Sequence, residues 1–369
     1  MVVYFSIAAG AAFVSYLARR TEQQSKAIAV LLYTAAIVIF CHFAGARDLK
    51  VGTDTSFYAY NSYKAALSEA FNTFWRSSEF GDWGPLYKLL CWTSVNFARS
   101  FYGYLFCIEL LTVIPLVIAA REFLGDYLWF GVYLFGILFY PMSFNMMRQM
   151  IAMSFLLLAF IAASGRKPLK YIIWLMIAIG FHTSAILGIL FYPLILFSRD
   201  STLGPGLKLI IIFCAGIAFV GVTPKLILML PGNHFQWYIS DASLFGGGIR
   251  MITLTMILAV VLGLLGFLFT RGIELAEDDR LSLFELLAIF CFGVICLLLS
   301  LLSFYLYRIA FIFIYVVVLM LPKLCSAVKD SHSRYLMIAV AIIATGVWST
   351  DYYFVQQSHE VIPYIFSTI

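Results

Sequence analysis

An arginine stands at the start of an apolar stretch of this chain, where a charge is costly. Residues 144–160 read FNMMRQMIAMSFLLLAF, with Arg148 and Gln149 a few positions into the run. At the centre of a bilayer an arginine costs at least about 2.5–3.5 kcal/mol, so it usually faces protein, water or an anionic ligand. The pair predicts a site that binds an anion or a polar substrate group.

A histidine later in the chain is a candidate for proton transfer. His182 lies in IAIGFHTSAILGI, residues 177–189, where we expect a helix to break. Irregular backbone at membrane depth is tolerated only where it is buried in protein or lines a water-filled cavity. An imidazole there is well placed to move a proton. A histidine in an apolar stretch can equally be a structural hydrogen-bonding group, and the sequence leaves both interpretations open.

The segment GARDLKVGTDTSFYAY, residues 45–60, offers charged side chains just after an apolar run. Arg47 could pair with a lipid phosphate, and Asp54 could hold a sugar hydroxyl or that arginine. Asp54 is also a second candidate for a general base. The plain alternative is a solvated loop on the membrane surface.

Other polar residues could contribute to substrate binding. Glu79 precedes Trp83 in EFGDWGPLYKLL, a carboxylate beside an aromatic ring as in many carbohydrate sites, although the same letters suit an ordinary helix start. Arg250 follows three glycines, and Tyr307 and Arg308 end the turn SFYLYR. The histidines lack metal-binding spacing, so neither a metal nor another cofactor is expected.

The composition indicates which kind of secondary structure must position these residues. The 369 residues are 63% hydrophobic and 12% charged, with a mean hydropathy of +0.96, too apolar for the surface of a soluble protein. A net charge of +5 is ordinary for a membrane protein and does not suggest a nucleic-acid partner. The chain is therefore an all-α, polytopic integral membrane protein, and its cysteines are small buried hydrophobes. We expect the first segment to be a retained helix and not a signal peptide.

We expect about 12 transmembrane helices in a single domain, residues 1–369. Ten apolar segments have near-spanning length, at 1–18, 27–44, 101–120, 127–144, 147–164, 207–222, 251–270, 283–302, 309–322 and 335–350. Residues 171–197 complete the set if they form a broken hairpin of two short helices, while 84–100 stays outside as an interfacial or re-entrant piece. This arrangement leaves most lysines and arginines cytoplasmic, as the positive-inside rule favours.

The same topology places the polar candidates on one side. Both termini and the large loops, about 45–100 and 223–250, are then periplasmic. The outer face receives residues from most of the chain, namely Arg47, Asp54, Arg148, His182, Arg250 and Arg308. Single arginines near helix ends often only snorkel to headgroups. Their common side nevertheless predicts one site.

Several stretches together resemble the EpsG family of Wzy-type bacterial polysaccharide polymerases. They are RDLKVGTDTSFY, FNMMRQMIAMSF, GFHTSAIL, YLYR and the Pro-Tyr tail. The resemblance implies a metal-independent glycosyltransferase of the bacterial inner membrane, active at the periplasmic face in O-antigen, lipopolysaccharide, capsule or exopolysaccharide assembly. An architecture like that of the glycosyltransferase-C enzymes is compatible with it.

The resemblance also implies substrates and roles. Such enzymes move a glycan chain from an undecaprenyl-diphosphate carrier to the non-reducing end of a second lipid-linked repeat unit, beside a flippase and a chain-length regulator of the same pathway. Arg148 would then meet the donor diphosphate, supported by Arg47, Arg250 or Arg308. His182 is the first candidate for the base and Asp54 the second.

Two other classes fit part of the pattern. A flippase or transporter of lipid-linked oligosaccharides would also use arginines for a diphosphate, but its charged groups would be spread through the membrane depth. An O-antigen ligase or a membrane acyltransferase could use arginine and histidine at the outer face. Only the acceptor distinguishes a ligase from a polymerase.

Overall fold

The computed structural model describes residues 1–229, 277–303 and 306–367, and no strand occurs in these ranges. They contain eight helices long and apolar enough to cross a membrane. The chain is thus an all-α, polytopic membrane protein, as predicted. It divides into two compact units, Met1–Ile186 with Thr345–Ile369, and Leu187–Ala344.

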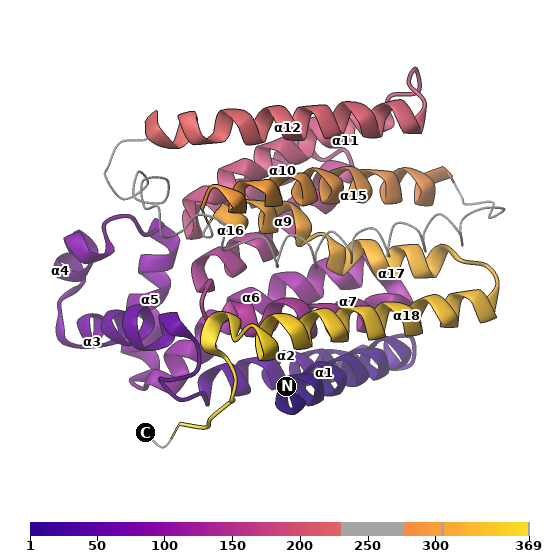
Figure 1. Ribbon diagram of the computed structural model, residues 1–369. Coiled ribbons are helices and arrows are strands. Elements are labelled where there is room, and N and C mark those ends of the chain that lie inside the picture. The colour runs from indigo at the N-terminus through magenta and orange to yellow at the C-terminus, as the bar shows by residue number, and fades with distance from the viewer. Residues whose placement is uncertain (230–276, 304–305, 368–369) are drawn as a thin grey trace. The chain divides into compact units, whose positions relative to one another are not determined.

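The first unit is built on six apolar helical segments (Figure 1). They are α1 (Val2–Thr21), α2 (Lys26–Gly45), α6 (Phe101–Leu124), the run formed by α7 (Leu128–Leu134), a π-helical turn (Phe135–Phe139) and α8 (Tyr140–Ser143), then α9 (Met147–Ser164) and α10 (Pro168–Phe181). The helix α2 packs against α1 and α6, and α9 packs against α6 and α10. The buried faces are mostly apolar, with a few polar residues among them, such as Ser15, Glu109 and Gln149.

Local sequence explains where these helices begin and end. The Ser25 and Ser100 side chains accept hydrogen bonds from the Ile28 N–H (3.4 Å) and the Gly103 N–H (3.1 Å), and these bonds cap the starts of α2 and α6. Pro168 opens α10, because its fixed φ suits a first helical position. Gly125, at φ 55°, ends α6, so the predicted segments 101–120 and 127–144 form separate helices that pack together.

Between α2 and α6 the chain forms short helices rather than a long loop. They are α3 (Tyr60–Ser68), α4 (Phe71–Arg76) and α5 (Pro85–Ala98), preceded by a π-helical turn, Thr55–Ala59. At 1.5 Å per residue, the 14 residues of α5 reach about 21 Å, short of the roughly 30 Å of a bilayer core. This length agrees with the interfacial or re-entrant piece expected at 84–100.

The second unit is centred on α15 (Glu277–Cys296). It packs against α11 (Phe191–Arg199), α12 (Pro205–Met229), α16 (Tyr307–Ile314) and α17 (Val317–Ala327). The buried Glu285 pairs with Arg199, and Lys208 donates to the Ser198 carbonyl at 2.7 Å. The helix α18 (Ser331–Ser349) runs from this unit into the first. The predicted span 251–270 lies outside the described residues.

The break predicted within 171–197 is confirmed. The helix α10 ends at Phe181, His182 is extended (φ −150°, ψ 122°), and a 3₁₀ helix at Thr183–Leu190 leads into α11. At 14 residues α10 is also too short to cross a bilayer. The out-and-back path of the two halves, and with it the orientation of both termini, stays a prediction.

Candidate functional site

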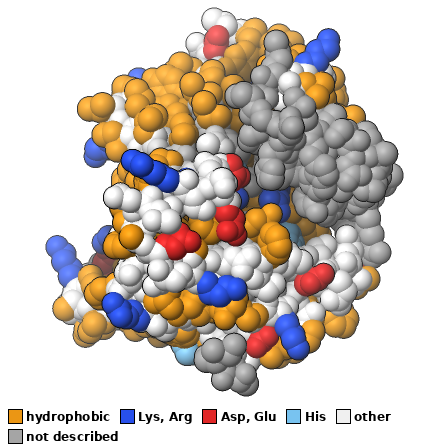
Figure 2. All heavy atoms as spheres, turned by 90° about the vertical axis from the view of Figure 1, so that its left-hand side faces the viewer, with side chains coloured by type: hydrophobic (Ala, Val, Ile, Leu, Met, Phe, Trp, Pro, Cys, Tyr) orange, Lys and Arg blue, Asp and Glu red, His pale blue; other side chains and the backbone are white. Residues whose placement is uncertain are grey.

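Polar segments from distant parts of the sequence meet at one end of the first unit. This end holds α3, α4, α5 and the C-terminal tail, at the left of Figure 1. Phe366 of the tail pairs with Arg47 in a β-bridge. We call this the α3–α5 end. Figure 2, which looks at this side, shows acidic and basic side chains interspersed on the visible surface.

Arg148 lies at the second position of α9, within this end. Its guanidinium stands over the Trp83 ring, 4.9 Å from the centroid, and its Nη1 is 3.9 Å from Asp82 Oδ2. That separation is too long for a hydrogen bond, and among the described residues the guanidinium donates none. One quarter of the side chain is exposed. Arg148 is thus oriented by an aromatic ring while its donors remain available.

The segment that carries Asp82 and Trp83 also contacts the broken end of α10. A Cβ on Gly84 would lie 2.4 Å from the Gly180 carbonyl oxygen and 2.7 Å from that of Phe181. Only glycine permits so close an approach of two backbones. The contact places the Arg148 environment against the helix end that leads to His182.

His182 is half-buried at this break. Its Nδ1 is 2.6 Å from Ser184 Oγ and accepts from the Ser184 N–H at 3.3 Å. Because Nδ1 is an acceptor of that N–H, the hydrogen of a neutral ring is on Nε2. The backbone of His182 leaves the helix while its ring stays oriented by Ser184. This geometry suits either a base or a structural group, so the two interpretations from the sequence both remain.

Arg47, expected to bind a phosphate, is buried at 2% exposure. It donates through Nε to Thr55 Oγ1 (3.1 Å) and through Nη1 to the Ala44 carbonyl (2.5 Å), and it covers the Phe144 ring at 4.2 Å. These contacts fix the loop after α2. In this structure Arg47 therefore stabilises the loop after α2, whereas Arg148 is partly exposed.

Two polar residues that sequence reasoning passed over contribute to this end. Asn145 accepts from the Asp54 N–H at 2.9 Å and so connects the Asp54 loop to the start of α9. Glu109, buried in α6, accepts from Ser143 Oγ at 2.9 Å, and its charge counters the lowering of the pKa of Arg47 that burial causes. A signal existed for Glu109, the single charged residue of the apolar segment 101–120, whereas Asn145 lies among other polar residues, Ser143, Arg148 and Gln149.

The remaining candidates are divided between the two units and the residues that the structure does not describe. Glu79 is exposed in a short 3₁₀ turn, Ser78–Phe80, and Gln149 is buried beside Arg148. Tyr307 is buried at the start of α16 in the second unit, where it packs on Phe311, and Arg308 follows it. Arg250 lies outside the described residues. Within the described ranges, no group of three or more His, Cys, Asp or Glu could hold a metal ion.

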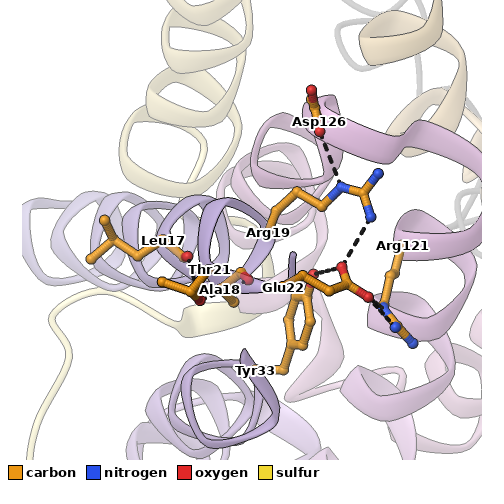
Figure 3. A network of polar contacts seen from close by, with 8 residues as sticks. All are labelled: Leu17, Ala18, Arg19, Thr21, Glu22, Tyr33, Arg121 and Asp126. Atoms are coloured by element: carbon orange, nitrogen blue, oxygen red, sulfur yellow. Dashed lines mark hydrogen bonds and ion pairs between the residues drawn. The ribbon is translucent and has the colours of Figure 1, made fainter. Parts of the chain in front are cut away.

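The opposite end of the first unit carries a different kind of polar cluster (Figure 3). Glu22, between α1 and α2, accepts from Arg19 (2.9 Å), from Tyr33 (3.1 Å) and from Arg121 at the end of α6. Arg19 also donates to Asp126 at 3.1 Å. The hydrogen bond from Arg121, with support from Arg19, lowers the pKa of Glu22 to about 2. We call these residues the Glu22 cluster.

Fold and site thus define a polytopic, all-α membrane protein with an arginine-bearing polar site at one end of a helical unit. A comparison with protein-family models matches residues 1–366 to the EpsG family. The chain belongs to the EpsG family, and this membership links it to polysaccharide biosynthesis at a membrane. Comparisons with curated proteins and with solved structures returned no match.

Proposed function

We propose that this protein is a Wzy-type polysaccharide polymerase. It would transfer a growing glycan from an undecaprenyl-diphosphate carrier to the non-reducing end of a second lipid-linked repeat unit, at the periplasmic face of the bacterial inner membrane. EpsG family membership over nearly the whole chain supports polysaccharide synthesis, and the site supports the reaction type.

The proposal rests on the partial exposure of the Arg148 side chain and on its hydrogen-bond donors, which are unused within the described residues. Its guanidinium is partly exposed, held over Trp83, and donates no hydrogen bond to the described residues. It stands in the first turn of an 18-residue helix, where the helix dipole adds positive potential. A lipid diphosphate offers the planar oxygen pairs that a guanidinium fork binds best.

The reaction needs two functions from the protein. An acceptor hydroxyl oxygen attacks the anomeric carbon of the donor, the bond from that carbon to the diphosphate oxygen breaks, and the lipid diphosphate departs with the electron pair. Arg148 would stabilise the negative charge that develops on the leaving group, as fixed cations do in a partly dehydrated site. The hydroxyl proton passes to a base within hydrogen-bond reach.

His182 is the first candidate for this base. It lies at a break in the backbone next to the segment of Asp82 and Trp83, and its imidazole can take up a proton near neutral pH. Asp54 is the second candidate, half-buried with its backbone held by Asn145.

Glycan analysis of a strain that lacks this gene tests the proposal. The polymerase account expects the ladder of long chains to disappear while molecules carrying one repeat unit remain, and a plasmid copy should restore the ladder. Loss of the single-unit product as well would indicate a flippase. Long chains that accumulate on the lipid carrier without reaching their acceptor would indicate a ligase.

A further inference from the structure

Three successive backbone carbonyl groups of the C-terminal tail accept hydrogen bonds from other segments of the first unit. The His359 carbonyl accepts from Asn145 Nδ2 at 2.7 Å, that of Glu360 from the Gly52 N–H at 3.0 Å, and that of Val361 from the Tyr4 hydroxyl at 2.8 Å. These bonds cross more than 200 positions of sequence. The tail is thus attached to the residues around the Asp54 loop.

The backbone of this segment is strained. Gln357, His359 and Glu360 have φ values of 53°, 71° and 51°, in the left-handed region that non-glycine residues rarely occupy. Such conformations are unfavourable and persist only where the surrounding structure holds them. The His359 ring is held by Tyr352, whose hydroxyl is 3.1 Å from Nε2. The strain turns the carbonyls of His359 and Glu360 toward their donors.

Asn145 joins this tail to the Asp54 loop. Its side chain is 2% exposed, and Oδ1 accepts from the Asp54 N–H (2.9 Å) and the Thr53 hydroxyl (3.1 Å) while Nδ2 donates to His359. The amide oxygen of Asn145 thus accepts from two donors, and its amide nitrogen donates to one carbonyl, so both polar atoms of the side chain are used. Asn145 also lies just before α9, so the same residue is tied to the helix that carries Arg148.

The loop that contains Gly52 and Asp54 has little conformational freedom. Gly52 is at φ 90°, a conformation that suits glycine, and its N–H is bound to Glu360. A Cβ there would approach Asn145 Oδ1 at 3.0 Å. The turn 52–54 is therefore held between the tail and Asn145.

We propose that Asn145 and residues 359–361 form a positioning device that holds Asp54 beside the start of α9. The inference rests on the proposed function, because it makes the tail a structural part of the polymerase site. A site built this way needs Asp54 at a fixed distance from the substrate that Arg148 binds. Displacement by about 1 Å can cost about 10²-fold in rate.

The test uses two variants of the full chain in detergent or nanodiscs. Asn145→Ala removes both contacts, and Asn145→Asp keeps the acceptor for Asp54 but loses the donor to His359. Asn96→Ala is the matched control. Asn96 is half-buried, and its side-chain amide donates to the Ala66 and Trp92 carbonyls, which are not part of the Asp54 loop. Each protein is examined for polymerisation rate, for binding of a polyprenyl diphosphate, and for amide hydrogen exchange.

We expect both Asn145 variants to lose about 10²-fold in turnover with unchanged diphosphate binding. Exchange should become faster in 46–55 and 358–367 and stay unchanged in α5. Wild-type exchange in those segments, or turnover equal to that of Asn96→Ala, would overturn the positioning role. If the wild-type protein itself binds no polyprenyl diphosphate, the proposed function fails, while the exchange data still decide whether Asn145 and the tail hold the turn.

Discussion

The two ends of the first unit hold arginines in opposite ways. In the Glu22 cluster, Arg19 and Arg121 share one carboxylate, and Arg19 also reaches Asp126 (Figure 3). At the α3–α5 end, Arg148 has a carboxylate only at 3.9 Å and an aromatic ring beneath it. A cluster whose charges satisfy one another connects helices, whereas a partly exposed arginine with open donors is suited to a ligand.

The largest expected effect concerns the sides on which these ends lie. The predicted topology puts the α3–α5 end outside and the Glu22 cluster inside. A cysteine at exposed Glu79 should therefore react with a membrane-impermeant maleimide in intact cells, and one at exposed Gln24 should not. The label is measured against the native cysteines as background. Reaction at Gln24 with protection at Glu79 would reverse the orientation.

Next in size is the effect of His182→Gln. Glutamine can hydrogen-bond but cannot take up the acceptor proton, so polymerisation should fall about 100-fold or more, the usual scale of general base catalysis. Diphosphate binding should survive. The control is His42→Gln, an exposed histidine of the same unit that contacts Tyr102.

Retention of near wild-type rate in His182→Gln would remove His182 from the mechanism. It would promote Asp54, whose Asn variant should then be the inactive one.

Gly84→Ala should damage the α3–α5 end alone. The new methyl group would meet the Gly180 carbonyl at 2.4 Å, and overpacking of this kind costs about 1–3 kcal/mol. The displaced Asp82 and Trp83 would lower activity, by less than the loss of a base. Gly10→Ala is the matched control, because nothing lies within 4 Å of its added carbon. Equal activity and melting temperature in both variants would refute the contact.

The smallest effect is expected at the Glu22 cluster. The pKa of Glu22 is about 2, below its unfolded value, so its contribution to stability is complete above about pH 4.5 and is lost as pH falls toward 2. Glu22→Gln should lower the melting temperature by a few degrees at pH 7, at roughly 2–4 °C per kcal/mol, and should polymerise normally. The difference should shrink at low pH. A large loss of activity would mean that this end is functional.

The sequence was informative about helices and about single charges, because both follow from local hydrophobicity. It predicted the apolar helices of the described residues and the break at His182. It also singled out Arg148 as a charge within an apolar run, and the binding role of Arg148 stays a prediction. It could not reveal that Arg47 is buried, since burial depends on Thr55, Phe144 and the tail coming together.

The polar contacts of Asn145 were equally out of reach. Its partners Asp54 and His359 lie about 90 and 214 positions away, and hydrogen bonds of this kind leave no periodic pattern. The same holds for Gly84, whose role depends on the backbone of α10.

The most direct test of the central claim is the affinity of Arg148 variants for a polyprenyl diphosphate. Arg148→Lys keeps the charge but replaces the planar fork with a point donor, so purified protein should bind at least about 10-fold more weakly than wild type, and Arg148→Ala more weakly still. Arg76→Lys, an exposed arginine at the same end, is the control and should bind normally. Wild-type affinity in both Arg148 variants would contradict the account and leave Arg148 without a role in binding the leaving group.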